Sequence, residues 1–565
     1  MKFLLCLLFS LLFLFFAQPT QAIVNPNSVP NNKFGIHIIS ASIDEASPAG
    51  SLVNSSGGDW GYITVLIESK DRDKNKWQAF FDDLRKRHLI PIVRLATQPD
   101  PAGFWKRPYQ REEEAWANFL DELNWPTKNR YVIIYNEPNH ATEWGNSVDA
   151  KDYAQTLNKT IDELKKKSEN FFILNAGFDA SAPEKLPNYS DQFEFMRQMN
   201  DEVPGIFNKL DGFASHSYPN PGFVSSPDDF GRGSVRTFAW EMGVLRELAV
   251  NKDLPIFITE TGWKHSDGQK FDPSLPSPEK IAQNYKIAFE GAWNSNRIVA
   301  VTPFLLNYQE TPFDHFSFQK NGEKNYHPQF VEIKKMPKLK GRPIQEDQAN
   351  LVKGKIFSSL VAGENYAIAL TFKNIGQSIW NEYETVTLQA VLGGGELEFK
   401  GVPIPKGVKV EPGQDHTFLV KIKAPGDGKY KIALNLFRGN EQFSSKSVEF
   451  ETEVKSPVIL QVKAKLRWKE NSSGDYILGV TGVIQDSFKK IALNSGGESE
   501  NIEMRQLLPE YTFEFSLRKP YYKSKSLIQN VKSGINTLDF GILEPDFPAA
   551  ILNPKELWKL LPFSN

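Results

Sequence analysis

The chain has 565 residues, of which 40% are hydrophobic and 24% are charged, values typical of globular proteins and not of disordered or fibrous ones. Because this length exceeds what one hydrophobic core supports, we expect two to four domains. The formal net charge of -2 leaves no basic excess to neutralise phosphates, so we expect no nucleic acid partner.

The first 22 residues have the pattern of an export signal. Lys2 precedes the apolar stretch 3–17, and small or polar residues follow up to Ala22. This predicts a signal peptide over residues 1–22 and a secreted, extracellular protein, with attachment to the cell surface left open. An uncleaved anchor is the alternative, but the apolar stretch is shorter than the roughly 18 residues of a membrane span, so we expect no stable span in the mature chain. The only cysteine, Cys6, lies in this segment, which excludes disulfides and cysteine chemistry from the mature chain.

Between residues 30 and 338, short apolar runs alternate with segments of helical periodicity. The runs cover residues 34–40, 60–67, 90–96, 131–135, 171–176, 210–215, 256–259 and 298–306. The helical segments are 77–88, 112–123, 153–164, 235–250 and 278–293. Several runs are continuously apolar, as expected for parallel strands that are buried on both faces. Eight strands alternating with helices predict an α/β fold, the (β/α)₈ TIM barrel. A doubly wound open sheet is the alternative, but no glycine-rich phosphate loop follows the first run.

The pattern changes at the basic, proline-flanked stretch 337–343, which predicts a linker. Beyond it, short strands at 366–372, 385–390, 416–422 and 430–436 are separated by turn residues such as Pro412 and Gly413. They predict a small all-β sandwich over residues 345–455, which resembles the Ig-like accessory modules of secreted bacterial enzymes, with Trp380 in its core. A second sandwich is predicted over residues 456–545.

Two of the predicted barrel strands end in a carboxylate. The fourth continues into Asn136-Glu137-Pro138, and the seventh ends Ile256-Phe257-Ile258-Thr259-Glu260. Active residues of such barrels lie at the carboxyl ends of the strands. A charge directly after an apolar strand is costly unless a partner or a function holds it there. Two convergent carboxylates supply what glycosidic bond cleavage requires, an acid for the leaving oxygen and a nucleophile or electrostatic stabiliser.

These motifs resemble the clan of retaining (β/α)₈-barrel glycoside hydrolases, which includes cellulase, xylosidase and β-1,3-glucanase families. The resemblance covers residues 33–336 and implies that Glu137 is the acid/base and Glu260 the nucleophile. Asn136 corresponds to the clan residue that hydrogen-bonds the sugar 2-hydroxyl. His216-Ser217-Tyr218 is similar to the clan's His-x-Tyr, and its tyrosine would contact the nucleophile.

Further residues are predicted to contact the substrate or the nucleophile. Arg94 resembles a clan arginine that binds the nucleophile, and His37 and Trp263 could line the sugar subsite. On the eighth strand, where the clan usually has a tryptophan under the sugar, this chain has Phe304. No metal and no cofactor is implied, because no metal-binding or phosphate-loop motif is present.

The sequence therefore predicts a secreted retaining glycoside hydrolase that acts on a β-linked polysaccharide or oligosaccharide. The alternative is a non-catalytic carbohydrate-binding protein, secreted or on the cell surface, with a glycosidase-like barrel. The sugar, the linkage and the oligomeric state are left open.

Overall fold

The computed structural model describes residues 23–443, 446–482, 487–550, 555, 557 and 560. The predicted signal peptide over residues 1–22 lies outside the described residues. The chain divides into two compact units, Met1–Glu346 with Gly376–Ser378, and Asp347–Ile375 with Ile379–Asn565. Within the described ranges, no helix has both the length and the apolar character of a bilayer span.

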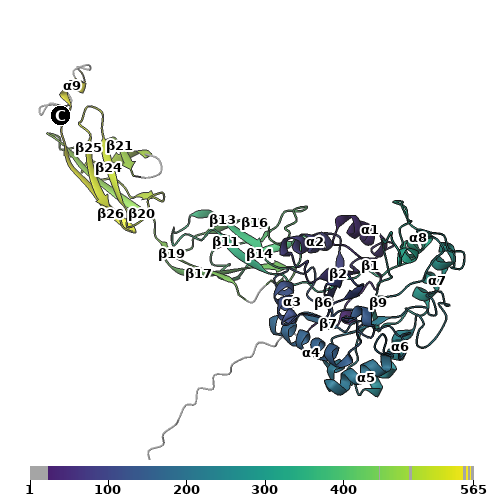
Figure 1. Ribbon diagram of the computed structural model, residues 1–565. Helices are drawn as coiled ribbons and strands as arrows, with labels where there is room; N and C mark the ends of the chain where they lie inside the picture. Colours follow the sequence, from purple (N-terminus) through teal and green to yellow (C-terminus); the bar gives the residue numbers. More distant parts are fainter. Residues whose placement is uncertain are drawn as a thin grey trace, which may run out of the picture. The chain divides into compact units, whose positions relative to one another are not determined.

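The first unit is a mixed α/β structure in which parallel strands alternate with helices (Figure 1). The strands are β1 (Gly35–Ile38), β2 (Gly61–Glu68), β3 (Leu89–Ala96), β6 (Arg130–Ile133), β7 (Phe171–Leu174), β8 (Phe213–His216), β9 (Ile256–Glu260) and β10 (Ile298–Val301). Each overlaps one of the eight predicted apolar runs. They form two sheets, β1-β2-β3-β6-β7 and β10-β9-β8, in which all pairs are parallel. Two single parallel bridges, Leu174 with Gly212 and Phe34 with Val301, connect the sheet edges.

A main helix follows each of these strands. The helices are α1 (Ile43–Val53), α2 (Lys74–Lys86), α3 (Glu112–Asp121), α4 (Ala150–Lys167), α5 (Gln192–Glu202), α6 (Thr237–Glu247), α7 (Pro278–Glu290) and α8 (Pro328–Lys335). Five of them overlap the predicted helical segments, whereas α1, α5 and α8 were not predicted. Helix α1 contains Pro48 and Gly50, two residues that disfavour a helix interior, so burial of its apolar face must outweigh a poor local propensity.

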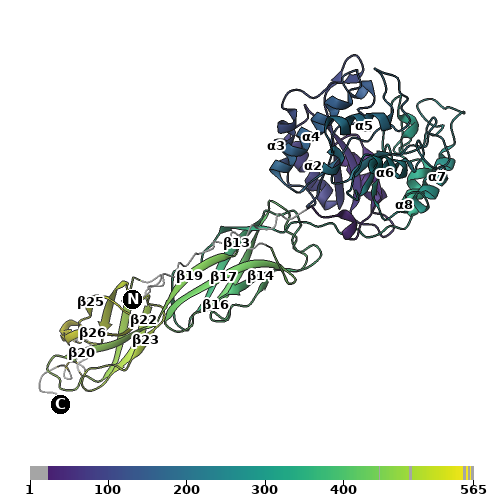
Figure 2. The same ribbon diagram turned by 90° about the horizontal axis from the view of Figure 1, so that it is seen from below.

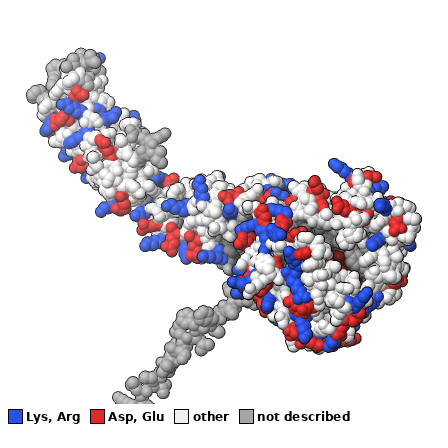
Figure 3. All heavy atoms as spheres, viewed as in Figure 1, with Lys and Arg blue, Asp and Glu red and all other residues white. Residues whose placement is uncertain are grey.

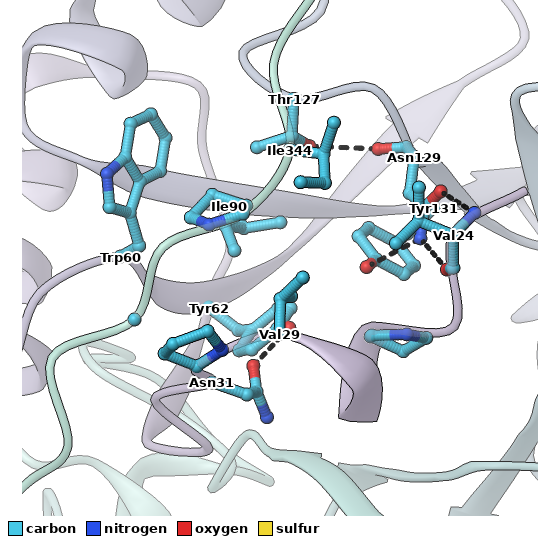
Figure 4. A pocket seen from close by; sticks show the side chains of 14 residues that line it. Val24, Val29, Asn31, Trp60, Tyr62, Ile90, Thr127, Asn129, Tyr131 and Ile344 are labelled. Atoms are coloured by element: carbon cyan, nitrogen blue, oxygen red, sulfur yellow. Dashed lines mark hydrogen bonds between the residues drawn. The ribbon is translucent and has the colours of Figure 1, made fainter.

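The amino ends of the strands are closed by the chain segment that precedes β1 (Figure 4). Asn129 and Val24 exchange two hydrogen bonds, of 2.7 and 3.1 Å, and the Tyr62 hydroxyl donates to Asn31 Oδ1 at 2.7 Å. A cavity of about 20 Å³ remains between these groups, enough for about one water molecule. It lies at the end of the strands opposite the two predicted catalytic carboxylates.

The predicted linker 337–343 is in fact packed on the first unit. Lys338 is only 8% exposed. Its Nζ donates to the carbonyl oxygens of Ile333 at 2.6 Å and Met336 at 3.0 Å, and to Ser55 Oγ at 2.9 Å. Because a buried ammonium is stable only when it is hydrogen-bonded, these contacts fix the segment after α8 to the unit.

We expect Lys338→Met to lower the free energy of unfolding by about 1–3 kcal/mol, because two buried carbonyl groups lose their donor. The exposed neighbour Lys340 gives the matched control, and Lys340→Met should change stability by no more than about 0.5 kcal/mol. Urea denaturation of both variants measures the difference. Equal stabilities would show that residues 337–343 behave as a free linker.

The second unit consists mainly of β-sheets (Figure 2) and has one short helix, α9 (Phe547–Ala550), near its end. Its first strands are β11 (Ala349–Lys353), β12 (Ser359–Val361), β13 (Asn365–Asn374), β14 (Val386–Leu392), β15 (Val402–Pro403), β16 (Asp415–Lys423), β17 (Gly428–Arg438), β18 (Glu441–Gln442) and β19 (Val448–Lys455). They are followed by β20 (Val458–Leu466), β21 (Gly474–Thr481), β22 (Ser487–Leu493), β23 (Ile502–Met504), β24 (Thr512–Arg518), β25 (Lys525–Asn530) and β26 (Gly534–Leu543). One core lies between residues 356 and 454 and includes the fully buried Trp380, and another lies between residues 458 and 543. The predicted domain bounds and the Ig-like character stay predictions.

Charged side chains of both signs are interspersed on the face shown in Figure 3. Among the described residues, some ion pairs join side chains one helical turn apart, such as Arg87 with Asp83 at 2.7 Å and Arg197 with Asp201 at 2.6 Å. Ion pairs that remain accessible to solvent contribute little to stability individually. The expectation that nucleic acid is not a partner stays a prediction.

Candidate active site

Glu137 lies just beyond the carboxyl end of β6, where the backbone turns sharply. Tyr135 and Glu137 have φ angles of 68° and 30°, in the left-handed region that non-glycine residues rarely adopt. Each such residue costs about 1–2 kcal/mol. The Glu137 amide donates to the Gly177 carbonyl oxygen at 3.1 Å, which helps to hold this conformation. The turn directs the carboxylate of Glu137 toward His216.

Glu260 is the last residue of β9 and only 7% exposed. Its Oε2 accepts a hydrogen bond from the Tyr218 hydroxyl at 3.1 Å, and its Oε1 accepts one from Arg94 Nη1 at 3.4 Å. Burial alone would raise the pKa of Glu260, but the positive charges of His216 and Arg94 and the bond from Tyr218 hold it below the ordinary value. Glu260 is therefore ionised at neutral pH.

His216, the last residue of β8, connects the two carboxylates. Its Nδ1 lies 2.7 Å from Glu137 Oε1 and 3.8 Å from Glu260 Oε2. Burial lowers the pKa of His216, but the neighbouring Glu260 and Glu137 outweigh this effect and raise it above 6.5. One oxygen of each glutamate and one imidazole nitrogen all lie within 4.8 Å of one another. The two predicted catalytic carboxylates thus share one site.

Tyr218 remains a hydrogen-bond donor over the whole working pH range. Burial, together with the charges of Glu260 and Glu137, holds the pKa of its hydroxyl well above 10. The phenol therefore stays protonated and can only stabilise the ionised form of Glu260.

His37 and Asn136 lie beside the carboxylates, each with an unused polar atom. His37 on β1 is buried, and its Nδ1 lies 3.9 Å from Glu260 Oε1 without a hydrogen-bond partner in the described chain. Burial lowers the pKa of His37 to about 3, so the ring is neutral. Asn136 Nδ2 donates to Glu143 Oε2 at 3.2 Å, whereas none of the described groups donates to its buried Oδ1.

Trp263 does not line the site, in contrast to the sequence prediction. Its ring is 1% exposed, packs edge-on against Tyr285 with the ring centroids 5.0 Å apart, and donates from Nε1 to the Ser225 carbonyl oxygen at 2.8 Å. A tryptophan right after a strand end can point outward to the site or back into the helix layer, and here the helix α7 residue Tyr285 holds it in the core. We therefore withdraw Trp263 from the predicted substrate contacts.

A third carboxylate, Glu143, was missed by the sequence analysis. Burial and the nearby Glu137 raise the pKa of Glu143 to about 7, although Arg94 and Asn136 oppose this shift. His140 Nε2 and Asp179 Oδ2 form a further pair at 2.7 Å, and His140 also feels the charge of Glu137. Glu143 ends a three-residue 3-10 helix (Ala141–Glu143), and His140 and Asp179 lie outside the main helices and strands, where no periodicity or motif marks them.

An aromatic cluster borders the site at the end of β10. Phe304 is partly exposed and lies 5.3 Å from the ring of His37 and 5.2 Å from that of Phe313, as measured between ring centroids. Phe316 packs against both Phe304 and Tyr218, at 5.7 and 6.0 Å. An apolar surface therefore adjoins the buried carboxylate.

Glu137, His216 and Glu260 could also serve as a metal-binding set, since their ligand atoms lie within 4.8 Å. The surroundings fit a cation poorly. Both oxygens of Glu260 already accept hydrogen bonds from Arg94 and Tyr218, and the arginine places a positive charge beside the centre. The expectation of no metal stays a prediction.

Comparison with known proteins gives only distant structural similarity. No family model matches the sequence, and none of the curated proteins matches it. The chain is similar to an FMN-binding β-glucuronidase from Facaelibacterium prausnitzii L2-6, with 11% identity, a TM-score of 0.34, and coverage of 76% of this chain and 57% of that one. It is also similar to a family 39 glycoside hydrolase from Bacteroides cellulosilyticus WH2 (13% identity, TM-score 0.37, 70% and 82% coverage). A family 30 subfamily 8 xylanase from Clostridium acetobutylicum matches with 11% identity, a TM-score of 0.33, and 85% and 96% coverage. Similarity of this degree carries no inference about the activity of this chain.

Tyr218→Phe tests the stabilisation of the charged Glu260. The variant loses a hydrogen bond to a carboxylate, so we expect the free energy of unfolding at pH 7 to fall by about 1.5–3 kcal/mol. The pKa of Glu260, depressed in the native protein, should rise. A depressed carboxyl pKa stabilises the fold above the unfolded pKa, and this contribution is lost as the pH falls through the folded pKa. The deficit should therefore shrink in acid.

Carboxylate NMR titration and denaturation at several pH values measure both effects. Tyr62→Phe is the control, because it removes a hydroxyl from the opposite end of the strands. An unchanged Glu260 titration in Tyr218→Phe would contradict the assigned bond.

Proposed function

We propose that the first unit is a closed (β/α)₈ barrel that acts as a retaining glycoside hydrolase on a β-linked polysaccharide or oligosaccharide. The observation that best supports this proposal is that oxygens of Glu137 and Glu260 lie within 4.8 Å of each other. Carboxyl groups of retaining glycosidases are about 5–5.5 Å apart, whereas inverting ones need about 6.5–9.5 Å to admit a water molecule. The two bridges between the sheet edges support closure of the barrel.

In the first step, ionised Glu260 attacks the anomeric carbon and forms a glycosyl ester while the glycosidic C–O bond breaks. Glu137 gives its proton to the departing oxygen. In the second step, Glu137 takes a proton from a water molecule, whose oxygen attacks the anomeric carbon and releases Glu260. The lowered pKa of Glu260 suits the nucleophile, because attack requires the ionised form.

The remaining contacts position the reacting groups. Tyr218 and Arg94 hold the two oxygens of Glu260, and His216 holds Glu137. The unpartnered Oδ1 of Asn136 is suited to accept a hydrogen bond from a sugar hydroxyl. The exposed part of the Phe304 ring offers an apolar surface for a sugar face, in the place of the tryptophan that the clan usually has.

We further propose that the protein is secreted, on the basis of the apolar N-terminal segment. The alternative function, non-catalytic carbohydrate binding, predicts binding without turnover. Hydrolysis of a nitrophenyl β-glycoside or β-linked polysaccharide by the wild type, and its loss in Glu260→Ala, would exclude that alternative.

Azide rescue distinguishes the roles of the two carboxylates. In Glu260→Ala no glycosyl ester can form, so turnover of an activated aryl glycoside should fall on the order of 10⁴-fold or more. Azide should then attack from the vacated face and give a glycosyl azide of inverted configuration. In Glu137→Ala the first step survives with an activated leaving group, and deglycosylation becomes slow. Azide should accelerate this turnover and give a product of retained configuration.

NMR of the two azide products measures the outcome. Glu143→Ala is the control, since it removes a neighbouring carboxylate that takes no part in either displacement, and azide should not alter its product. The opposite stereochemistry would exchange the two roles, and full activity in either variant would remove that residue from the mechanism.

A further inference from the structure

We infer that Gly177 is a positioning residue of this active site, where the absence of a side chain lets His216 reach Glu137. The inference rests on the proposed function for its catalytic consequence. Gly177 lies three residues after the end of β7, and neither the predicted motifs nor the strand-end carboxylates mark it. Its backbone is not in the left-handed region, so the need for glycine comes from space and not from conformation.

The ring of His216 occupies the place of a side chain at position 177. A Cβ built on Gly177 would lie 2.0 Å from His216 Cδ2, 2.2 Å from Nε2 and 2.7 Å from Cγ. Carbon atoms in van der Waals contact are about 3.5–4.0 Å apart. A methyl group at this position therefore cannot coexist with the observed ring.

The backbone around Gly177 cannot retreat easily. The amide of Ala176 donates to the Tyr153 hydroxyl at 2.8 Å, which itself donates to the Ile134 carbonyl oxygen at 3.0 Å. The next residue, Phe178, is fully buried against the ring of Phe195, with centroids 5.7 Å apart. The segment is thus held on both sides of the glycine.

His216 is the partner that must move. It is 3% exposed, and a hydrogen bond joins Nδ1 of its ring to Glu137 Oε1 at 2.7 Å. Displacing the ring from Gly177 would break or lengthen this bond. Gly177 also accepts the Glu137 amide hydrogen at 3.1 Å, so it contacts both members of the pair. The distance between Glu137 and His216 therefore depends on residue 177 being glycine.

A double-mutant cycle of Gly177→Ala and His216→Ala in the full chain tests this inference. We expect Gly177→Ala to lower kcat for a nitrophenyl β-glycoside by about 10- to 100-fold, as for a misplaced catalytic group. In the His216→Ala background the clash is gone, so adding Gly177→Ala should cost less than about twofold. Equal losses in both backgrounds would overturn the inference.

Gly212→Ala is the matched control for instability alone. A Cβ there would meet three core side chains at 2.9 Å, away from Glu137 and His216. This variant should lose stability while the imidazole NMR titration of His216, assigned with His216→Ala, stays unchanged.

The NMR titration also separates the inference from the proposed function. Besides the charge of Glu260, the bond to Glu137 raises the pKa of His216. In Gly177→Ala this bond is lost, so the His216 titration should move to lower pH, toward that of Glu137→Gln. The same shift is expected even if the wild type hydrolyses no glycoside. Absence of hydrolysis would reject only the proposed function. An unshifted His216 titration in Gly177→Ala would reject the positioning role, whatever the activity.

Discussion

The first unit is organised around an ionised carboxylate at the end of an apolar strand. Glu260 follows Ile256 to Thr259, all buried, and an unpaired charge in such surroundings would cost several kcal/mol. The compensation comes from separate strands, with Arg94 on β3 and His216 and Tyr218 at the end of β8. Their donor atoms meet at Glu260 only if these strands keep their register. The strands position the Glu260 carboxylate, and its need for these donors in turn fixes the register of the strands.

A second set of contacts extends this constraint to Glu137. The left-handed turn at Tyr135 and Glu137 is held by the carbonyl group of Gly177, and the carboxylate is held by His216. His216 thus lies between the carboxylates of Glu137 and Glu260, which have different hydrogen-bond partners. Under the proposed function, Glu260 must stay ionised while Glu137 exchanges a proton, so the two carboxylates need different partners. Arg94 and Tyr218 donate hydrogen bonds to Glu260, whereas Glu137 is bonded to His216.

The sequence predicted the repeating part of this structure and the two strand-end carboxylates that share a site, whereas their catalytic roles stay predictions. Buried parallel strands leave long apolar runs, so all eight could be recognised, and an acid directly after such a run is unusual enough to notice. Helix α1 was not predicted, because Pro48 and Gly50 interrupt the helical pattern of its sequence. Glu143 and Gly177 were not predicted, because each matters through contacts with residues distant in sequence, Arg94 for Glu143 and His216 for Gly177. Trp263 was misassigned because a motif does not specify on which side of a strand end a ring packs.

The contacts that close the amino ends of the strands stabilise the first unit, whereas the candidate site lies at the opposite, carboxyl ends. Stabilising residues and site residues are therefore separate sets. Asn31, Tyr62 and Asn129 tie down the chain there without contacting the carboxylates. The loops at the carboxyl ends can consequently lengthen, shorten or change composition without altering the contacts at the amino ends. Under the proposed function, natural variants of this chain could accept different polymers through changes in these loops alone, while Glu137 and Glu260 stay unchanged.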